Sequence, residues 1–421
     1  MSVALKRTFQ NELTLNEVVT QYPDIPRLVI IKTDVQRRGI HYTERALGVV
    51  DPEIHLVNDP AVSELFGSRD GAEKPLPASL LLRDGTSILV SSTPLEDNPY
   101  LVDLVDGRLA LVDNGQFIEH VEFWRKPKFY DLKTSSGIPM RQIFSARPQR
   151  LSIVQSSYCH FWTDHKGCRF CDINNNNKKR NEDAKTRPRI KPQDISETIR
   201  EALKEPGRFT GICLTGGSVL AGNGLFDKEV DLYIETLQAI GENFATKKFP
   251  SQLISSAFNE KQLRRLYEET GLMSYTSDLE VLNEDKFNWI CPGKADNVGY
   301  QEWKQRLIRS VDIFGKGHVA TGIVGGVELA KPYGFISEDE ALRSTLDEAE
   351  SLAEKGVTTI FVVWSPRPGS DFHEQQNASL DYYVRLASGL HQLRVKYGLT
   401  VDFDDYRRCG NHPDSDLARL I

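Results

Sequence analysis

Three of the chain's six cysteines lie within thirteen residues, as Cys159, Cys168 and Cys171, with gaps of eight and two residues between them. The stretch just before them, residues 150–157, is apolar and β-branched, so it predicts a buried strand. The cysteines would therefore follow the carboxyl end of a strand, where α/β folds build their sites. Three thiolates with no fourth nearby suit a four-iron cluster with one iron left open for a small molecule.

A structural zinc site is the alternative, because three cysteines with His160 or His165 also make a known ligand set. A disulfide framework is disfavoured, since six cysteines in 421 residues are few and the first residues lack a secretory signal. No apolar run approaches the length of a membrane span. We therefore expect a cytoplasmic protein whose cysteines are reduced.

The composition narrows the class of protein further. Apolar residues make up 39% of the chain and charged residues 26%, which is typical of a globular protein. The formal net charge is −7, whereas a nucleic-acid-binding domain usually carries a basic face. We expect neither a nucleic acid nor a membrane as a partner.

Residues 1–145 do not repeat the pattern of the rest of the chain and predict a smaller β-rich or α+β domain of unknown role. The run 28–32 predicts a short buried strand. The runs 79–90 and 101–112 each predict a hairpin, because an Asp-Gly pair divides two apolar segments. None of these segments carries a motif that points to chemistry.

From residue 150 onward, predicted strands and helices alternate, which implies a parallel sheet with right-handed crossovers. Six strand–helix units fall short of the eight of a full barrel, so we expect a partial (β/α)6 TIM-like barrel over residues 146–375. A C-terminal helix and tail would occupy residues 376–421. A doubly wound open sheet is the alternative fold. The expected strands are 150–157, 209–215, 251–256, 272–280, 318–324 and 358–364, and the expected helices are 192–204, 227–240, 260–269, 300–314, 337–355 and 380–397.

Several strand ends carry unusual residues that would meet at one face of this barrel. The second strand ends in Thr215, Gly216 and Gly217, and the fourth ends at Glu280. One glycine after a strand usually marks only a turn, but such ends converging behind a three-cysteine loop indicate a site. The later strands add Ile323, Gly325, Glu328 and the Pro368-Gly369 turn.

Over about residues 150–370 these motifs resemble the radical S-adenosylmethionine (SAM) superfamily, and within it the biotin-synthase-like enzymes. The resemblance implies that the three cysteines hold a [4Fe–4S] cluster, with Phe170 as the aromatic residue before the last cysteine. It further implies that SAM is bound by the glycine pair, by an adenine-packing pattern on the fifth strand, by the turn after the sixth, and by a polar contact at the end of the fourth. The matching residues are Thr215, Gly216, Gly217, Glu280, Ile323, Gly325, Glu328 and Pro368.

Two positions depart from the family pattern. The first cysteine gap has eight residues, whereas the commonest spacing in the family has three. The glycine pair is followed by Ser218, whereas an acidic residue is usual there.

The resemblance implies an enzyme that reductively cleaves SAM at the cluster and forms a 5′-deoxyadenosyl radical. The radical would abstract hydrogen from a small-molecule biosynthetic substrate, with flavodoxin or ferredoxin as the electron donor. The alternatives are a radical SAM enzyme that modifies a peptide or RNA, and a non-catalytic zinc-binding α/β protein. A SAM cradle on the second and fifth strands favours the enzyme, because a zinc scaffold has no need of one.

The other cysteines are expected to be secondary. Cys213 lies within a predicted strand and is expected in the core. Cys291 precedes a proline and would be inert or substrate-facing. Cys409 and His412 have a metal-ligand spacing, but a simple solvated tail is the favoured interpretation.

Overall fold

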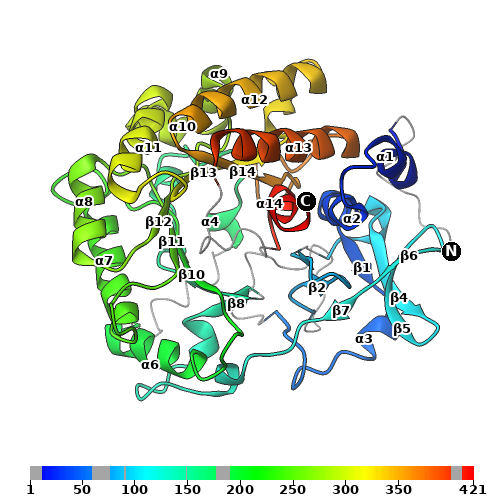
Figure 1. The fold of residues 1–421 in the computed structure, drawn as a ribbon, viewed down its shortest axis with the longest axis horizontal. Coiled ribbons are helices and arrows are strands. Elements are labelled where there is room, and N and C mark those ends of the chain that lie inside the picture. The colour runs from blue at the N-terminus through cyan, green and yellow to red at the C-terminus, as the bar shows by residue number, and fades with distance from the viewer. Residues whose placement is uncertain (1–11, 59–75, 90–91, 148, 177–189, 400–409) are drawn as a thin grey trace.

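The computed structural model describes residues 12–58, 76–89, 92–147, 149–176, 190–399 and 410–421. A curled seven-stranded sheet forms its larger half, with helices covering the outer side (Figure 1). Six of its strands are parallel and are neighbours in chain order, whereas β8 (Ser145–Arg147) runs antiparallel along one edge. The parallel strands are β9 (Arg150–Val154), β10 (Gly211–Thr215), β11 (Ser251–Ile254), β12 (Ser274–Thr276), β13 (Val319–Gly325) and β14 (Thr358–Val363).

This strand order distinguishes the two predicted folds. A doubly wound sheet reverses direction at a switch point, whereas here each strand pairs with the next one along the chain. The partial (β/α)6 barrel is therefore confirmed. Its covering helices are α6 (Pro192–Ala202), α7 (Asp227–Gly241), α8 (Glu260–Glu269), α11 (Tyr300–Phe314), α12 (Glu338–Glu354) and α13 (Leu380–Tyr397).

Local signals explain where these helices begin. Asn259 caps α8 by accepting from the backbone N–H of Gln262, whose side chain accepts in return from the Asn259 N–H. Ser337 caps α12 in the same position by accepting from the N–H of Glu340. Two short helices that were not predicted, α9 (Glu284–Ile290) and α10 (Pro292–Asn297), lie between β12 and α11.

The N-terminal part of the chain contains two small sheets. One has the order β1-β4-β5-β6, with β1 (Ile40–Tyr42) parallel to β4 (Tyr100–Val105), and β5 (Arg108–Asp113) and β6 (Gln116–His120) following as a meander. The other joins β2 (Leu80–Leu81) to β3 (Ser87–Ile88) and β7 (Glu122–Phe123). Both predicted hairpins are confirmed, with positive φ angles in their Asp-Gly turns. Helix α3 (Glu44–Leu47) packs against β4, whereas α1 (Leu15–Gln21) packs against α13.

The predicted strand at 28–32 is wrong, because these residues lie inside helix α2 (Arg27–Arg38). Every residue from Leu28 to Val35 is buried, so this run lacks the exposed polar face that would indicate an amphipathic helix. A continuous apolar, β-branched run cannot be told from a strand by periodicity alone.

The favoured interpretation of the C-terminus as a solvated tail is also wrong where the structure describes it. Residues 413–420 form helix α14 (Pro413–Leu420), which packs against α2, α13 and β14. The Asp416 carboxylate lies 2.6 Å from Lys32 Nζ of α2, and both side chains are fully buried. The His412 ring is buried too, with Nδ1 2.8 Å from the Phe361 carbonyl oxygen of β14. Cys409 lies outside the described residues.

The expected division of the chain into domains at residues 145 and 375 stays a prediction.

None of the helices in the described ranges combines the length and the apolar character that crossing a membrane takes.

Candidate active site

The three cysteines line one cavity of about 140 Å³ at the carboxyl ends of β9 to β12. Beside them the cavity reaches the glycine pair after β10, polar side chains beyond β11 and β12, and one lysine of α10. The part of the predicted strand-end cluster that lies on the first four parallel strands is thus brought together. The residues that line the cavity are Cys159, Phe161, Cys168, Phe170, Cys171, Ile173, Thr215, Gly216, Gly217, Ser218, Ile254, Ser255, Ser256, Asp278, Glu280, Lys294 and Trp303.

Backbone contacts fix the start of the cysteine loop. The Asn174 amide side chain pairs with the Cys159 backbone in both directions, since Oδ1 accepts from its N–H at 2.9 Å and Nδ2 donates to its carbonyl at 3.1 Å. The His160 N–H donates to the Ser218 carbonyl at 2.9 Å. The first cysteine is therefore tied both to the α4 turn (Ile173–Asn176) and to the end of β10.

The glycine pair makes room for this loop. A Cβ atom on Gly217 would lie 2.5 Å from the Tyr158 carbonyl oxygen and 2.7 Å from Cys159 Cα, and one on Gly216 would lie 2.8 Å from the Ser156 nitrogen. Real Cβ atoms do not approach backbone atoms so closely. The close packing of the cysteine loop on β10 thus requires glycine here, whether or not these residues also contact a ligand.

The thiols are close enough to perturb one another. Burial raises the pKa of Cys159 to about 11, and the neighbouring Cys168 adds to this shift. A hydrogen bond with Cys291, together with burial, holds the pKa of Cys168 well above its usual range. Burial and Cys168 do the same to the pKa of Cys171. As neutral thiols these side chains are stable in the cavity, and a metal would have to displace their protons.

The donor set fits an iron–sulfur cluster. In the described part of the chain, no three His, Cys, Asp or Glu side chains close around a point that would hold a single metal ion. A four-iron cluster instead spreads its cysteine ligands over separate irons. His160 and His165, the possible fourth ligands of a zinc site, do not line the cavity, and His165 is exposed. The three thiols around a common cavity are therefore a suitable frame for the cluster.

A buried ion pair lies in the same cavity. Lys294 Nζ donates to Glu280 Oε1 at 2.7 Å and to the Asp278 carbonyl at 2.6 Å, and it stands 4.7 Å from the centre of the Trp303 ring. Burial raises the pKa of Glu280 to about 7, against the opposing effect of Lys294. The pair offers a carboxylate and an ammonium group to a zwitterionic ligand.

Glu280 lies beyond β12 rather than at its end, because that strand is shorter than predicted. Its backbone continues alongside β13, where its N–H donates to the Gly322 carbonyl at 3.0 Å and its own carbonyl accepts from the Val324 N–H at 2.9 Å. Lys294 was missed in the sequence, since a lone lysine after a Pro-Gly pair carries no signal of burial.

An acidic residue also stands behind Ser218, although the chain lacks one directly after the glycine pair. The Glu229 carboxylate of α7 accepts from the Val219 N–H at 2.8 Å and from the Ser256 hydroxyl at 2.9 Å. Ser256 in turn lies 2.9 Å from the Ser218 hydroxyl. Burial raises the pKa of Glu229 to about 7. The sequence did not predict that Glu229 would contact the residues of the cavity, because it falls in the first turn of a helix that carries other charged residues.

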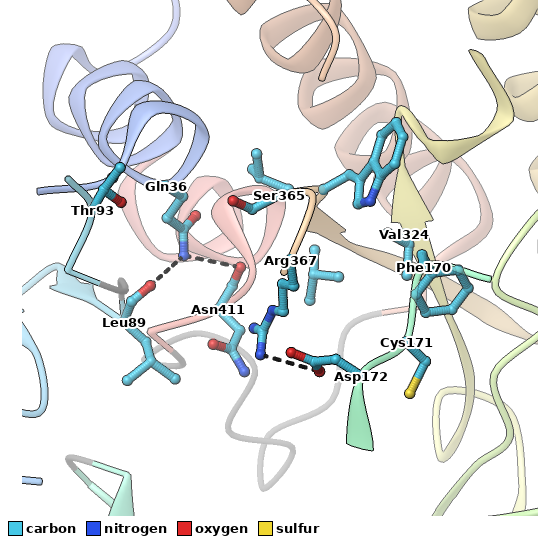
Figure 2. Close-up of a pocket in the computed structure, with 14 residues that line it drawn as sticks. Gln36, Leu89, Thr93, Phe170, Cys171, Asp172, Val324, Ser365, Arg367 and Asn411 are labelled. Atoms are coloured by element: carbon cyan, nitrogen blue, oxygen red, sulfur yellow. Dashed lines mark hydrogen bonds and ion pairs between the residues drawn. The ribbon is translucent and has the colours of Figure 1, made fainter. Parts of the chain in front are cut away.

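A second cavity of about 320 Å³ adjoins the first, and both are lined by Phe170 and Cys171. Figure 2 shows Arg367 and Asp172 paired in its lining, with Arg367 Nη1 3.7 Å from Asp172 Oδ1. Residues of the N-terminal part form the opposite side. The lining residues are Gln36, Gly39, Leu89, Thr93, Phe170, Cys171, Asp172, Val324, Val362, Val363, Trp364, Ser365, Arg367 and Asn411.

Four of the predicted cofactor-binding residues line neither cavity. Ile323 and Gly325 lie in β13, where a Cβ on Gly325 would collide with Leu386 of α13. The Glu328 carboxylate is buried and accepts from the Gly326 N–H and the Tyr382 hydroxyl. Pro368 is exposed. Their contacts to SAM stay predictions.

No protein-family model matches the chain. A curated relative, the bacteriochlorophyllide c C-7(1)-hydroxylase of Chlorobaculum limnaeum, is 23% identical over 351 residues, which are 75% of this chain and 83% of the relative.

Two solved structures are similar to this one. A radical SAM methyltransferase from Sphaerobacter thermophilus is 14% identical and has a TM-score of 0.39, with 97% of this chain and 100% of that chain covered. The cobalamin-dependent S-adenosylmethionine radical enzyme OxsB is 12% identical with a TM-score of 0.32, over 77% of this chain and 50% of its own. Because both TM-scores are low, the assignment of the fold rests on the strand order.

Both solved structures are named as radical SAM enzymes, the superfamily that the sequence motifs of this chain resemble. The curated relative is named as a hydroxylase, and the prediction of an enzyme is confirmed. The chain's place in the biotin-synthase-like branch and the role of its eight-residue cysteine gap stay predictions.

Proposed function

We propose that the chain binds a [4Fe–4S] cluster through Cys159, Cys168 and Cys171 and uses it to cleave SAM reductively. The observation that carries this proposal is the shared cavity in which three thiols meet the glycine pair of β10 and the Glu280–Lys294 pair. Thiolates are the ligands that iron–sulfur clusters take in proteins, and three of them leave one iron open.

The chain's own groups are suited to SAM, which carries an amino group and a carboxylate. Lys294 provides a positive charge for the carboxylate, and Glu280 provides an acceptor for the amino group. The glycine pair leaves backbone atoms of β10 uncovered at the same cavity. Phe161 and Trp303 supply apolar walls that limit the access of water.

The bound cluster would supply one electron from flavodoxin or ferredoxin, so that the S–C5′ bond of SAM breaks into methionine and a 5′-deoxyadenosyl radical that takes hydrogen from the substrate. The protein's part is to orient the reacting groups and to exclude competing reactions.

The adjoining cavity of about 320 Å³ is our candidate for the substrate, because it meets the cysteine cavity at Phe170 and Cys171. Its size suits a small molecule rather than a folded RNA or protein segment. Valine and tryptophan side chains make one wall, and polar side chains such as Arg367 and Asn411 can fix an orientation. The curated relative is named as a hydroxylase, and hydroxylation at carbon also replaces a C–H bond.

Anaerobic reconstitution with iron and sulfide tests the proposal. The full chain should take up about four irons and four sulfides and give the EPR signal of a reduced [4Fe–4S] cluster. Replacement of any one of the three cysteines by Ala should abolish this signal, whereas Cys213→Ala, in the core of β10, should keep it. Stoichiometric zinc without labile sulfide would instead establish the zinc-binding alternative.

A further inference from the structure

The corner between α9 and α10 is docked onto the cysteine loop through backbone hydrogen bonds. The Arg169 N–H donates to the Ile290 carbonyl at 2.9 Å, and the Gly293 N–H donates to the Lys166 carbonyl at 2.9 Å. The Arg169 guanidinium adds a third bond, from Nε to the Trp289 carbonyl at 2.9 Å. Cys168 thus lies between Lys166 and Arg169, the two residues of the cysteine loop that form backbone hydrogen bonds with this corner.

The register of these bonds places two cysteines opposite each other. One step back from Arg169 along the loop is Cys168, and one step on from Ile290 is Cys291. The other bond joins Lys166 and Gly293, and counting two residues forward from Lys166 and two residues back from Gly293 gives the same two cysteines. Cys291 is fully buried and lines neither cavity, so it lies behind Cys168 rather than facing a ligand. When Cys168 binds iron as a thiolate, its sulfur can only accept a hydrogen bond, so the Cys291 S–H is the group of this pair that can donate one.

Gly293 allows the approach. A Cβ atom there would lie 2.5 Å from the Lys166 carbonyl oxygen and 2.7 Å from Phe161 Cβ. The Lys166 ammonium also lies 2.6 Å from the Asp296 carboxylate of α10, across the same contact. The contact is therefore specified by a close backbone approach as well as by the thiol pair.

We infer that Cys291 is a positioning residue that sets the reduction potential of the cluster by donating its S–H hydrogen to the Cys168 sulfur. This inference rests on the proposed cluster. Hydrogen bonds to the ligand sulfurs tune the potentials of iron–sulfur clusters. Reduction adds negative charge to the cluster and its ligands, so a donor at Cys168 stabilises the reduced form more than the oxidised one and raises the potential.

The test is a redox titration of the anaerobically reconstituted full chain, with the reduced cluster followed by EPR. Cys291→Ala should keep its iron and sulfide, and its midpoint should move to a more negative potential. We expect a shift of about tenfold in the equilibrium between the two forms, or about 59 mV for a one-electron couple. Cys291→Ser retains a hydrogen-bond donor and should stay nearer the wild-type midpoint.

Cys213→Ala is the matched control, because it removes another buried cysteine that is absent from both cavities. Its midpoint should equal that of the wild type. A Cys291→Ala protein with a full cluster and an unchanged midpoint would overturn the inference. If Cys291→Ala loses its iron, Cys291→Ser decides: wild-type iron content and midpoint support the inference, and loss of the cluster overturns it. A wild-type chain that assembles no [4Fe–4S] cluster would mark the failure of the proposed function itself.

Discussion

Lys294 Nζ lies 2.7 Å from Glu280 Oε1 inside the cavity that the three cysteines line. Both residues come from segments outside the regular strands, and both side chains are largely buried, with exposed fractions of 10% for Lys294 and 16% for Glu280. The protein therefore maintains a charged pair where it would be costly to leave either charge alone.

Lys294→Met should destabilise the chain by roughly 3–5 kcal/mol, because it leaves the Glu280 carboxylate buried without its partner. Adding Glu280→Gln to this variant should restore much of the lost stability, since the uncompensated charge is then gone. Urea unfolding of the wild type, the two single variants and the double variant measures the coupling. Additive effects would show that the two side chains do not act as a pair.

Gly217→Ala should loosen the cysteine loop, because the new Cβ would meet the backbone of Tyr158 and Cys159. We expect less iron per folded chain after reconstitution. Gly325→Ala is the matched control, since its Cβ would meet side chains of Leu386 and Phe361 in the helix packing instead. It should lower thermal stability and leave the iron content per folded chain unchanged. Equal iron loss in both variants would argue against a specific role of Gly217.

Glu328 should make stability fall as the pH rises. Burial raises the pKa of its carboxyl from 4.5 to about 7, so the folded chain holds a proton there that the unfolded chain releases between these values. Relative to Glu328→Gln, the wild type should lose on the order of 3 kcal/mol of unfolding free energy between pH 5 and pH 8. Urea unfolding at both pH values measures the difference. Parallel curves for the two proteins would show that Glu328 ionises as freely in the folded state as in the unfolded one.

Lys32→Met should be strongly destabilising, by roughly 3 kcal/mol, because it removes the closer of the two cations that pair with the buried Asp416 carboxylate, the other being Arg419 at 3.4 Å. Lys355→Met, at the C-terminal cap of α12, exchanges an exposed lysine and serves as the control. Thermal unfolding of both variants tests whether α14 is part of the folded core. Similar melting temperatures would contradict the docking of α14 on α2.

The barrel was predictable because each strand and helix carries its own local signal. Helices α8, α11 and α13 fall on the predicted residues, and their caps and apolar periods lie within the segments themselves. Helix α2 was mistaken for a strand because its burial on nearly all sides comes from tertiary packing against α13 and α14. No window of sequence contains that information.

The site residues that directly follow strands could be predicted from the sequence, whereas those placed by tertiary contacts could not. The cysteines and the glycine pair follow strands and meet as expected at one cavity. Lys294 lines this cavity and Glu229 contacts its Ser256, and both come from helices whose sequence does not distinguish an inward lysine or glutamate from a solvated one. The partner of Cys168 was likewise invisible, since the register that brings Cys291 opposite it is a tertiary property.

The central claim is reductive cleavage of SAM, and a product assay tests it most directly. The reconstituted chain, given SAM and dithionite under anaerobic conditions, should release 5′-deoxyadenosine and methionine slowly even without its substrate, because correct substrates normally help to order the site. Cys171→Ala should release neither product above background. Formation of both products by the wild type alone is the result that we predict. S-adenosylhomocysteine as the only product of a protein that holds its cluster and binds SAM would contradict the account.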